Sequence, residues 1–267
     1  MKALFDVYVQ QFKTTLAAQV QYRAALVIWI ISHILEPVIY LVVWDTVARS
    51  SGGSIGTFST GDLAAYFILL MLVNHATFAW IMWEYEYRIR HGDLSFALLR
   101  PIHPIHSDIA DNVSFKLITF LFMLPIAAGL AIVFRATLPL IPWTWVAFVP
   151  ALLLAFLVRF LVEWTLAMAA FWTTRVSAIN QMYYVAALFL SGQVAPLSLM
   201  PFPIQVVATL LPFRWAISFP VELLLGRLTP VEALTGFAAQ AVWLAISLAL
   251  LKIVWRAGVR QYSAVGS

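Results

Sequence analysis

The sequence predicts an all-α integral membrane protein with six transmembrane helices, an N-terminal amphipathic interfacial helix and short re-entrant helices before the last span. Composition is the first observation. Of 267 residues, 63% are apolar and 10% are charged, whereas a soluble domain is nearer half apolar and a quarter charged. Mean hydropathy is +0.91. The second observation is a series of long apolar runs joined by short basic connections. Together they exclude a soluble enzyme and a disordered chain.

The apolar runs have the length of membrane spans. A helix needs about 20 mostly apolar residues to cross the hydrocarbon core of a bilayer. The runs are continuously apolar rather than alternating, which excludes the strands of a membrane barrel. They lie at about 24–47, 62–83, 110–134, 143–172, 179–200 and 231–255. Residues 24–267 are therefore expected to form one six-helix membrane domain.

Residues 1–23 predict a short helix that lies on the membrane surface. Its apolar side chains fall on one side of a helix, at Phe5, Tyr8, Val9 and Phe12. Lys and Arg set the orientation, because cytoplasmic connections carry more of them. Eleven basic residues fall on the side that holds both chain ends, and four on the other. We expect both termini in the cytoplasm.

The longest polar connection, residues 84–108, joins the second and third runs. Gly92 can end one helix, and Asp93 or Ser95 can cap a short new helix that ends at Arg100. The apolar side chains of this helix are Leu94, Phe96, Leu98 and Leu99. This composition favours a docking surface for a cytoplasmic partner. The alternative is a helix that rests among lipid headgroups.

The connection before the last run, residues 196–229, is apolar but interrupted by proline. The prolines are Pro196, Pro201, Pro203, Pro212 and Pro220. No piece between them is long enough to span a bilayer. Such pieces are typical of re-entrant helices, whose backbone is tolerated where protein covers it. A bulky extracellular cap is the alternative.

These features together resemble a known family, the type-2 ABC exporter permeases, in particular the six-span bacterial subunits of drug, viologen and daunorubicin-type efflux systems. The resemblance covers nearly the whole chain. It rests on the amphipathic N-terminal helix, the Arg-His-Gly-Asp-Leu…Leu-Leu-Arg-Pro run at 90–101 and the Leu-Pro-Phe-Arg-Trp-Ala…Phe-Pro-Val-Glu-Leu-Leu-Leu-Gly run at 211–226.

The resemblance implies a bacterial inner-membrane exporter subunit that works with separate ABC ATPase subunits and a second copy of itself or a homologous permease. It implies export of a hydrophobic or cationic small molecule. Contact with the ATPase would fall on Gly92, Asp93, Leu94, Phe96, Leu98, Leu99 and Arg100. An outer gate would include Pro196, Pro212, Phe213, Arg214, Pro220 and Glu222.

The chain itself lacks the residues that nucleotide or covalent chemistry requires. It contains no Gly-x-x-x-x-Gly-Lys-[Ser/Thr] phosphate loop and no Cys. We therefore expect no catalytic, cofactor or metal site, and ATP and Mg on the partner ATPase. The basic residues lie between membrane runs, so no nucleic-acid partner is expected. Two alternatives remain: an ion-coupled secondary transporter, which requires inverted repeats and more intramembrane carboxylates, and an intramembrane enzyme.

Polar residues inside the apolar runs are the remaining candidates. His33 and Glu36 in the first run, and Asn74 and His75 in the second, lie roughly 18 Å deep. An unpaired carboxylate there would cost several kcal/mol, so the four are expected to meet each other or water. Contact between helices is the favoured interpretation, and a substrate path or a proton relay are alternatives.

Arg159 and Glu163 form a second polar pair, four residues apart on one helical face. Arg159 is predicted near the cytoplasmic interface, where snorkelling of a long side chain explains it without a functional role.

Overall fold

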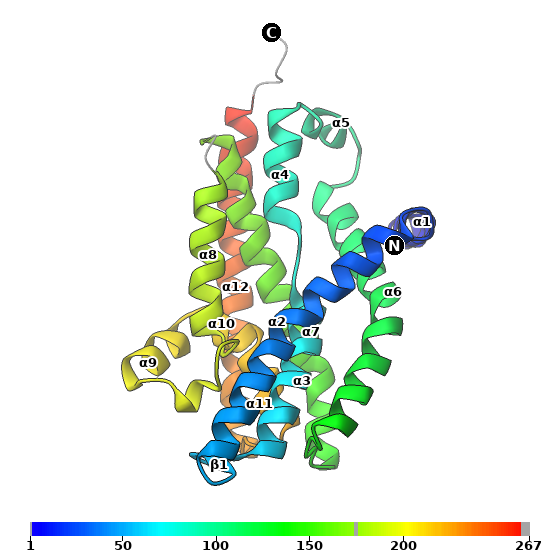
Figure 1. Cartoon of the computed structure of the whole chain (residues 1–267). Helices are drawn as coiled ribbons and strands as arrows, with labels where there is room; N and C mark the ends of the chain where they lie inside the picture. Colours follow the sequence, from blue (N-terminus) through cyan, green and yellow to red (C-terminus); the bar gives the residue numbers. More distant parts are fainter. Residues whose placement is uncertain (1, 174–175, 263–267) are drawn as a thin grey trace.

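The computed structural model describes residues 2–173 and 176–262 and is built mainly of helices aligned along one axis (Figure 1). Helix α5 (Leu94–Leu98) marks one end of the bundle. A two-strand hairpin, β1 (Ser54–Ile55) with β2 (Phe58–Ser59), marks the other. We call these the α5 end and the hairpin end.

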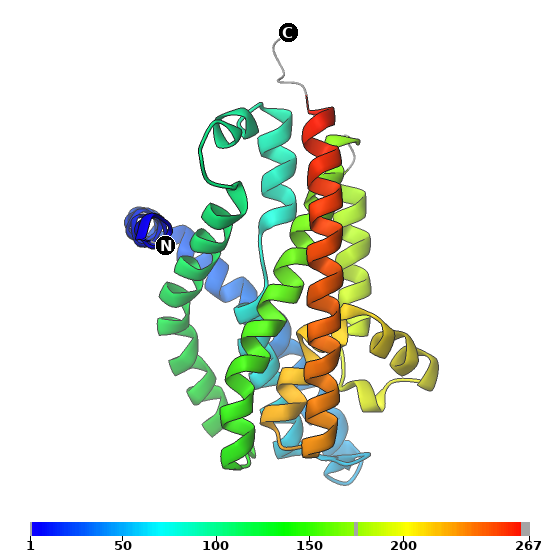
Figure 2. The ribbon, with the colours of Figure 1, turned by 180° about the vertical axis from the view of Figure 1, so that it is seen from behind.

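Several helices have the length and composition of membrane spans. They are α2 (Arg23–Ser50), the pair α3 (Thr60–Thr77) and α4 (Ile81–Arg90), α6 (Pro104–Val133), α7 (Pro142–Ala167) with the 3-10 turn η1 (Met168–Phe171), and α12 (Pro230–Gln261). Figure 2 shows α7 and α12 running along the back of the bundle. The predicted all-α membrane fold is confirmed. Five such spans are found among the described residues, and the count of six stays a prediction.

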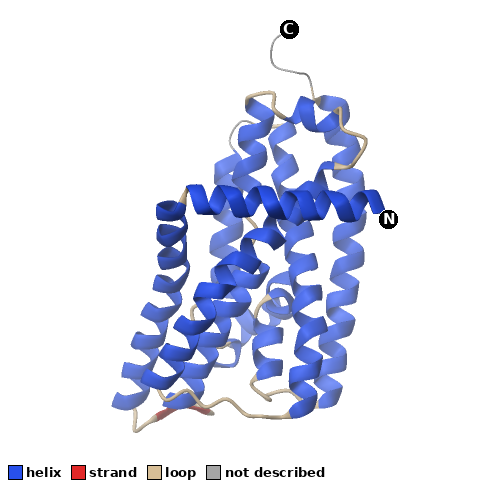
Figure 3. Ribbon diagram, turned by 90° about the vertical axis from the view of Figure 1, so that its right-hand side faces the viewer, coloured by secondary structure: helices blue, strands red, loops and turns tan. Residues whose placement is uncertain are grey.

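Helix α1 (Lys2–Gln21) runs across the long helices rather than along them (Figure 3). Phe5, Val9, Phe12 and Leu16 are exposed along it, at the i, i+4, i+7 spacing of one helical face. On another side, Thr15 Oγ1 donates a hydrogen bond of 2.6 Å to Asp111 Oδ1 of α6. Helix α1 is therefore amphipathic, although Tyr8 is half-buried rather than exposed with the apolar row.

The expected second run, 62–83, is not one continuous helix. Helix α3 ends at Thr77, and α4 begins at Ile81 after Phe78 and Ala79, which belong to neither helix. Beyond the break, α4 continues to Arg90. Helix α3 is the most enclosed element, because α2, α6, α7 and α11 all pack around it. The bundle core therefore centres on α3.

The helix in the expected fifth run, 179–200, ends at Leu190, ten residues early. Helix α8 spans Val176–Leu190, 15 residues. Gly192 then adopts φ +84°, a left-handed conformation that favours glycine, and its carbonyl accepts a hydrogen bond of 2.8 Å from the Tyr66 hydroxyl. This anchored turn stops the helix. Arg175, counted among the basic residues of the α5 side, lies outside the described residues.

The proline-rich segment that follows forms short helices, as its sequence predicts. They are η2 (Leu197–Leu199), α9 (Phe202–Leu210), α10 (Pro212–Ala216) and α11 (Ser218–Leu224). Helices α10 and α11 pack against α7, whereas α9 projects sideways from the bundle (Figure 1). Gly236 of α12 faces the Phe219 ring of α11 so closely that any Cβ would overlap it.

Candidate functional site

The predicted ATPase-contact segment forms a tight helical turn at the α5 end. Gly92 has φ +79° and lets the chain reverse after α4. Helix α5 ends at Leu98, before the predicted Arg100, and Asp93 makes no side-chain cap. Ser95 does not cap the helix either, since its hydroxyl lies 2.9 Å from the Tyr262 hydroxyl. The expected cap and length are therefore wrong, because a contact with the C-terminal segment holds this turn.

The four apolar side chains of this segment do not share one face. Leu94 is fully buried beneath the helix, and Leu98 is half-buried beside it. Phe96 is 70% exposed and Leu99 is 83% exposed. Asp93 and Arg100 are exposed as well. The outward apolar surface therefore consists of Phe96 and Leu99, with Leu94 as its anchor.

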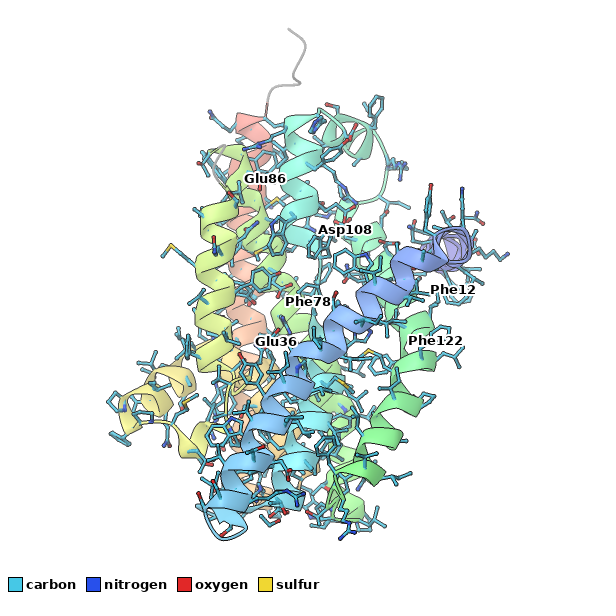
Figure 4. The ribbon with its side chains drawn as sticks, in the orientation of Figure 1. Phe12, Glu36, Phe78, Glu86, Asp108 and Phe122 are labelled. Carbon is cyan, nitrogen blue, oxygen red and sulfur yellow. The ribbon has the colours of Figure 1, made fainter. Side chains whose placement is uncertain are left out.

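A buried carboxylate, Asp108, fixes the base of this turn (Figure 4). Its Oδ2 accepts hydrogen bonds from the Tyr85 hydroxyl at 2.8 Å and from Trp164 Nε1 at 3.0 Å. Its Oδ1 accepts from Arg88 Nη1 at 2.7 Å. These donors come from α4 and α7, while Asp108 belongs to α6. One side chain therefore joins the three helices below α5.

His103 caps the N-terminus of α6, since its Nδ1 accepts a hydrogen bond from the Ile105 amide. Accepting this bond requires an unprotonated Nδ1. Burial, followed by the nearby His106, lowers the pKa of His103 and favours that form.

A buried ion pair holds the break between α3 and α4. Arg159 Nε lies 2.8 Å from Glu163 Oε1, and the side chains are 4% and 0% exposed. Arg159 Nη1 also donates to Asn74 Oδ1 at 2.7 Å and to Thr77 Oγ1 at 3.0 Å. Glu163 Oε2 accepts from the Ala79 amide at 3.1 Å. The pair thus binds the C-terminal end of α3 and the Ala79 amide two residues beyond it.

The predicted pairing of Arg159 with Glu163 is confirmed, but the predicted snorkelling is wrong. A snorkelling side chain keeps its charge in water, whereas this guanidinium lies in the protein interior. Burial is possible because side chains of α3 accept from the Arg159 guanidinium, and because the helix break leaves the Ala79 amide free to donate to Glu163.

The mid-membrane residues divide into separate contacts. The rings of His33 and His75 meet edge to face with centroids 5.2 Å apart. Asn74 turns instead to Arg159. Glu36 is exposed and has no hydrogen bond to a described residue. The structure brings the two histidines together and leaves Glu36 and Asn74 apart from them.

The predicted outer-gate residues lie together near the hairpin end. Pro212 and Pro220 are buried in α10 and α11, and Pro196 is buried before η2. The Phe213 ring contacts Tyr183 of α8, with centroids 5.4 Å apart. The remaining two residues form an ion pair. Arg214 Nη2 lies 3.6 Å from Glu222 Oε2.

Glu222 also accepts a hydrogen bond of 2.9 Å from Ser218. Burial raises the pKa of Glu222, although Arg214 opposes the shift. A cavity of about 260 Å³ lies beside this pair, with Arg227 and Thr57 also in its wall.

Sequence reasoning missed two features of this region. The role of Asp108 was missed, although a carboxylate near the start of an apolar run was a visible signal. The helix break at Phe78–Ala79 had no comparable signal, because the residues there are neither glycine nor proline.

Comparison with known proteins agrees with this arrangement. No curated protein sequence matches the chain. The family model described as "ABC-2 family transporter protein" matches residues 34–266, which include the α5 turn, the ion pair and the proline-rich helices. Members of that family are the membrane permeases of ABC transporters and work with ABC ATPase subunits. Since the match covers most of its length, this chain belongs to the ABC-2 family of transporter proteins.

Proposed function

We propose that the chain is the permease subunit of an ATP-driven exporter in a bacterial inner membrane, and that it moves a hydrophobic or cationic small molecule out of the cell. Two permeases would act with two separate ATPase subunits. The observation that carries this proposal is the α5 turn, which holds two large apolar side chains outward at one end of the bundle. Exposed Phe and Leu on a firmly supported turn fit a groove on a protein partner.

Orientation supports the same assignment. If the exposed apolar row of α1 lies among lipid headgroups, the α5 end lies beyond the membrane surface, since it extends past α1 in Figure 3. The basic residues concentrate at this end, as expected for a cytoplasmic side. Helix α8, about 22 Å long at 1.5 Å per residue, would complete the sixth crossing together with the segment that follows it.

The supports below α5 suggest how movement would pass inward. Leu94 and Asp108 join the turn to α4, α6 and α7, so a push on Phe96 displaces those helix ends together. Because a break separates α4 from α3, α4 would tilt while α3 keeps its position. This is a hinge motion that relies on a few residues at element ends.

A second copy of the chain would account for Glu36. A carboxylate exposed to lipid near the bilayer centre costs several kcal/mol. Glu36 lacks a hydrogen bond to the described residues, so its face of α2 is better placed against another permease or a water-filled pathway.

The experiment compares matched apolar-to-charged substitutions at the two ends. Phe96→Asp and Leu99→Asp should abolish co-purification of the ATPase and its stimulation. Leu140→Asp is the control, because Leu140 is also 83% exposed but lies near the opposite end, just before α7. If the ATPase still associates with both α5 variants, the proposed coupling is wrong. Helix α5 would then be a helix that rests among lipid headgroups.

A further inference from the structure

A groove of about 400 Å³ opens between α1, α2, the α3–α4 break and α6. Thr15 of α1 and Asp111 of α6 line one part of it, and Trp29, His33 and Trp80 line another. Since residues of α1 line the groove, the groove reaches the level where the proposed function places the inner membrane surface. The proposed function does not use this groove.

The carboxylate of Asp111 in the groove lining lacks a counter-ion among the described residues. Asp111 Oδ1 accepts hydrogen bonds from the Thr15 hydroxyl at 2.6 Å and from Gln11 Nε2 at 3.4 Å. Both donors are neutral, and no Lys or Arg among residues 2–173 and 176–262 forms an ion pair with it. A partly buried carboxylate of this kind favours a cationic ligand that also donates hydrogen bonds.

Near His75, the groove lining offers a hydrogen-bond acceptor to which no described residue donates. Thr119 Oγ1 donates its proton to the Phe115 carbonyl, so it accepts from His75 Nε2, 2.6 Å away. The proton on Nε2 leaves His75 Nδ1 as an acceptor, and this buried atom has no partner in the part of the chain that the structure describes. His75 itself is 4% exposed.

His33 repeats the pattern at a more open position. Its Nδ1 lies 2.8 Å from the Trp29 carbonyl, which can only accept. Nδ1 therefore carries the proton, and Nε2 is an acceptor. The imidazole pair, His33 with His75, thus offers acceptors next to the aromatic wall.

That wall suits a flat apolar group. The Trp29 and Trp80 rings meet edge to face with centroids 5.1 Å apart, and both are about two-fifths exposed. Phe78 continues the row, 6.3 Å from Trp80 between centroids. Aromatic faces attract flat rings and cations.

The cation in the groove wall, Lys116, is engaged elsewhere. Its Nζ donates to Asn112 Oδ1 at 3.2 Å and lies 4.6 Å from the centre of the Phe156 ring of α7. The charge of Lys116 therefore does not neutralise Asp111.

We propose that this groove binds an amphiphilic protonated amine that arrives from the inner leaflet. Its ammonium donates to Asp111, its flat apolar body lies against Trp29 and Trp80, and a further N–H or O–H group reaches the imidazole pair. Eight residues of α6 separate Asp111 from Thr119, so the two polar groups of the ligand lie about 12 Å apart. This inference rests on the proposed function and names its substrate class.

The test uses the full permease, without ATPase, in phosphatidylcholine nanodiscs. The probes are dansyl-amidopropyl-dimethylamine, protonated at neutral pH, and its trimethylammonium derivative, which has no ammonium proton to donate. Binding is followed by energy transfer from tryptophan to dansyl. We expect the trimethylammonium probe to bind about tenfold more weakly, because it loses the charge-assisted hydrogen bond to Asp111.

Asp111→Asn should raise the Kd of the dimethylamine probe about tenfold or more. Asp6→Asn is the matched control, because Asp6 lies exposed on α1 outside the groove, and should leave the Kd unchanged. His75→Phe removes the inner acceptor. Trp29→Ala provides a second, partly exposed position should the buried His75 variant fail to fold. Unchanged binding by Asp111→Asn, or equal affinity for both probes, would overturn the assignment.

Phosphatidylethanolamine supplies the same ammonium chemistry on a lipid. Its addition to the nanodiscs should not displace the probe, and displacement would reassign the groove to lipid headgroups. Failure of the probe to bind, with ATPase association still lost in Phe96→Asp, removes the groove inference alone. If the probe binds but Phe96→Asp still associates normally with the ATPase, the proposed coupling is wrong and the groove inference stands.

Discussion

The buried pair Arg159–Glu163 gives the sharpest prediction about stability. In Glu163→Leu, the Arg159 guanidinium stays buried but loses its 2.8 Å carboxylate partner. The Ala79 amide loses its 3.1 Å acceptor at the same time. Removing one partner of a buried pair costs about 3–5 kcal/mol, because an uncompensated charge remains. We expect the free energy of unfolding to fall by about that amount.

Glu163→Gln separates charge from hydrogen bonding. Its amide oxygen still accepts from Ala79 or Arg159, so we expect a smaller loss of about 1–3 kcal/mol. The matched control is Glu86→Leu, since Glu86 pairs at 3.1 Å with an arginine four residues away, and the Arg90 and Glu86 side chains are 49% and 14% exposed rather than enclosed. Surface pairs contribute about 0–1 kcal/mol.

The assay is unfolding by SDS titration in mixed micelles, followed by tryptophan fluorescence. A loss in Glu163→Leu no larger than that in Glu86→Leu would refute the reasoning, because it would mean that water or a rearranged partner reaches Arg159. A double variant provides a second check on the same ion pair. The double variant Arg159→Met with Glu163→Leu should be more stable than Glu163→Leu alone, since it removes the stranded charge.

Three further predictions concern topology, the α5 support and a close helix contact. In this Cys-free chain, an impermeant thiol reagent added to intact cells should label Leu140→Cys but not Leu99→Cys, and labelling of Leu99→Cys from outside would contradict the orientation. Asp108→Ala removes the shared acceptor of Tyr85, Arg88 and Trp164 below α5, so it should lower the melting temperature and weaken ATPase co-purification although no α5 residue is replaced. Normal ATPase association would separate Asp108 from coupling. Gly236→Leu should destabilise the chain by about 1–3 kcal/mol through overpacking against Phe219, which chemical unfolding would measure.

The sequence alone determined that this protein lies in a lipid bilayer, and it determined most of its helices. Continuously apolar runs of about 20 residues require helices, because lipid offers no partner to an open backbone. For the same reason, the prolines between 196 and 220 predicted short helices before the last long one, which the structure contains. The family followed from local sequence patterns at 90–101 and 211–226, and residues 34–266 confirm it.

Contacts between distant residues were decided only by the tertiary structure. The break after Thr77 depends on Arg159 and Glu163, more than 80 residues later, so no local pattern marks it. Likewise, α8 stops at Leu190 because Tyr66 holds the Gly192 carbonyl from another helix. Depth along a run placed His33, Glu36, Asn74 and His75 at one level, but the rotation of each helix decided which of them touch. Rotation is set by packing against neighbours, and the free energy that fixes it is not a property of any single segment.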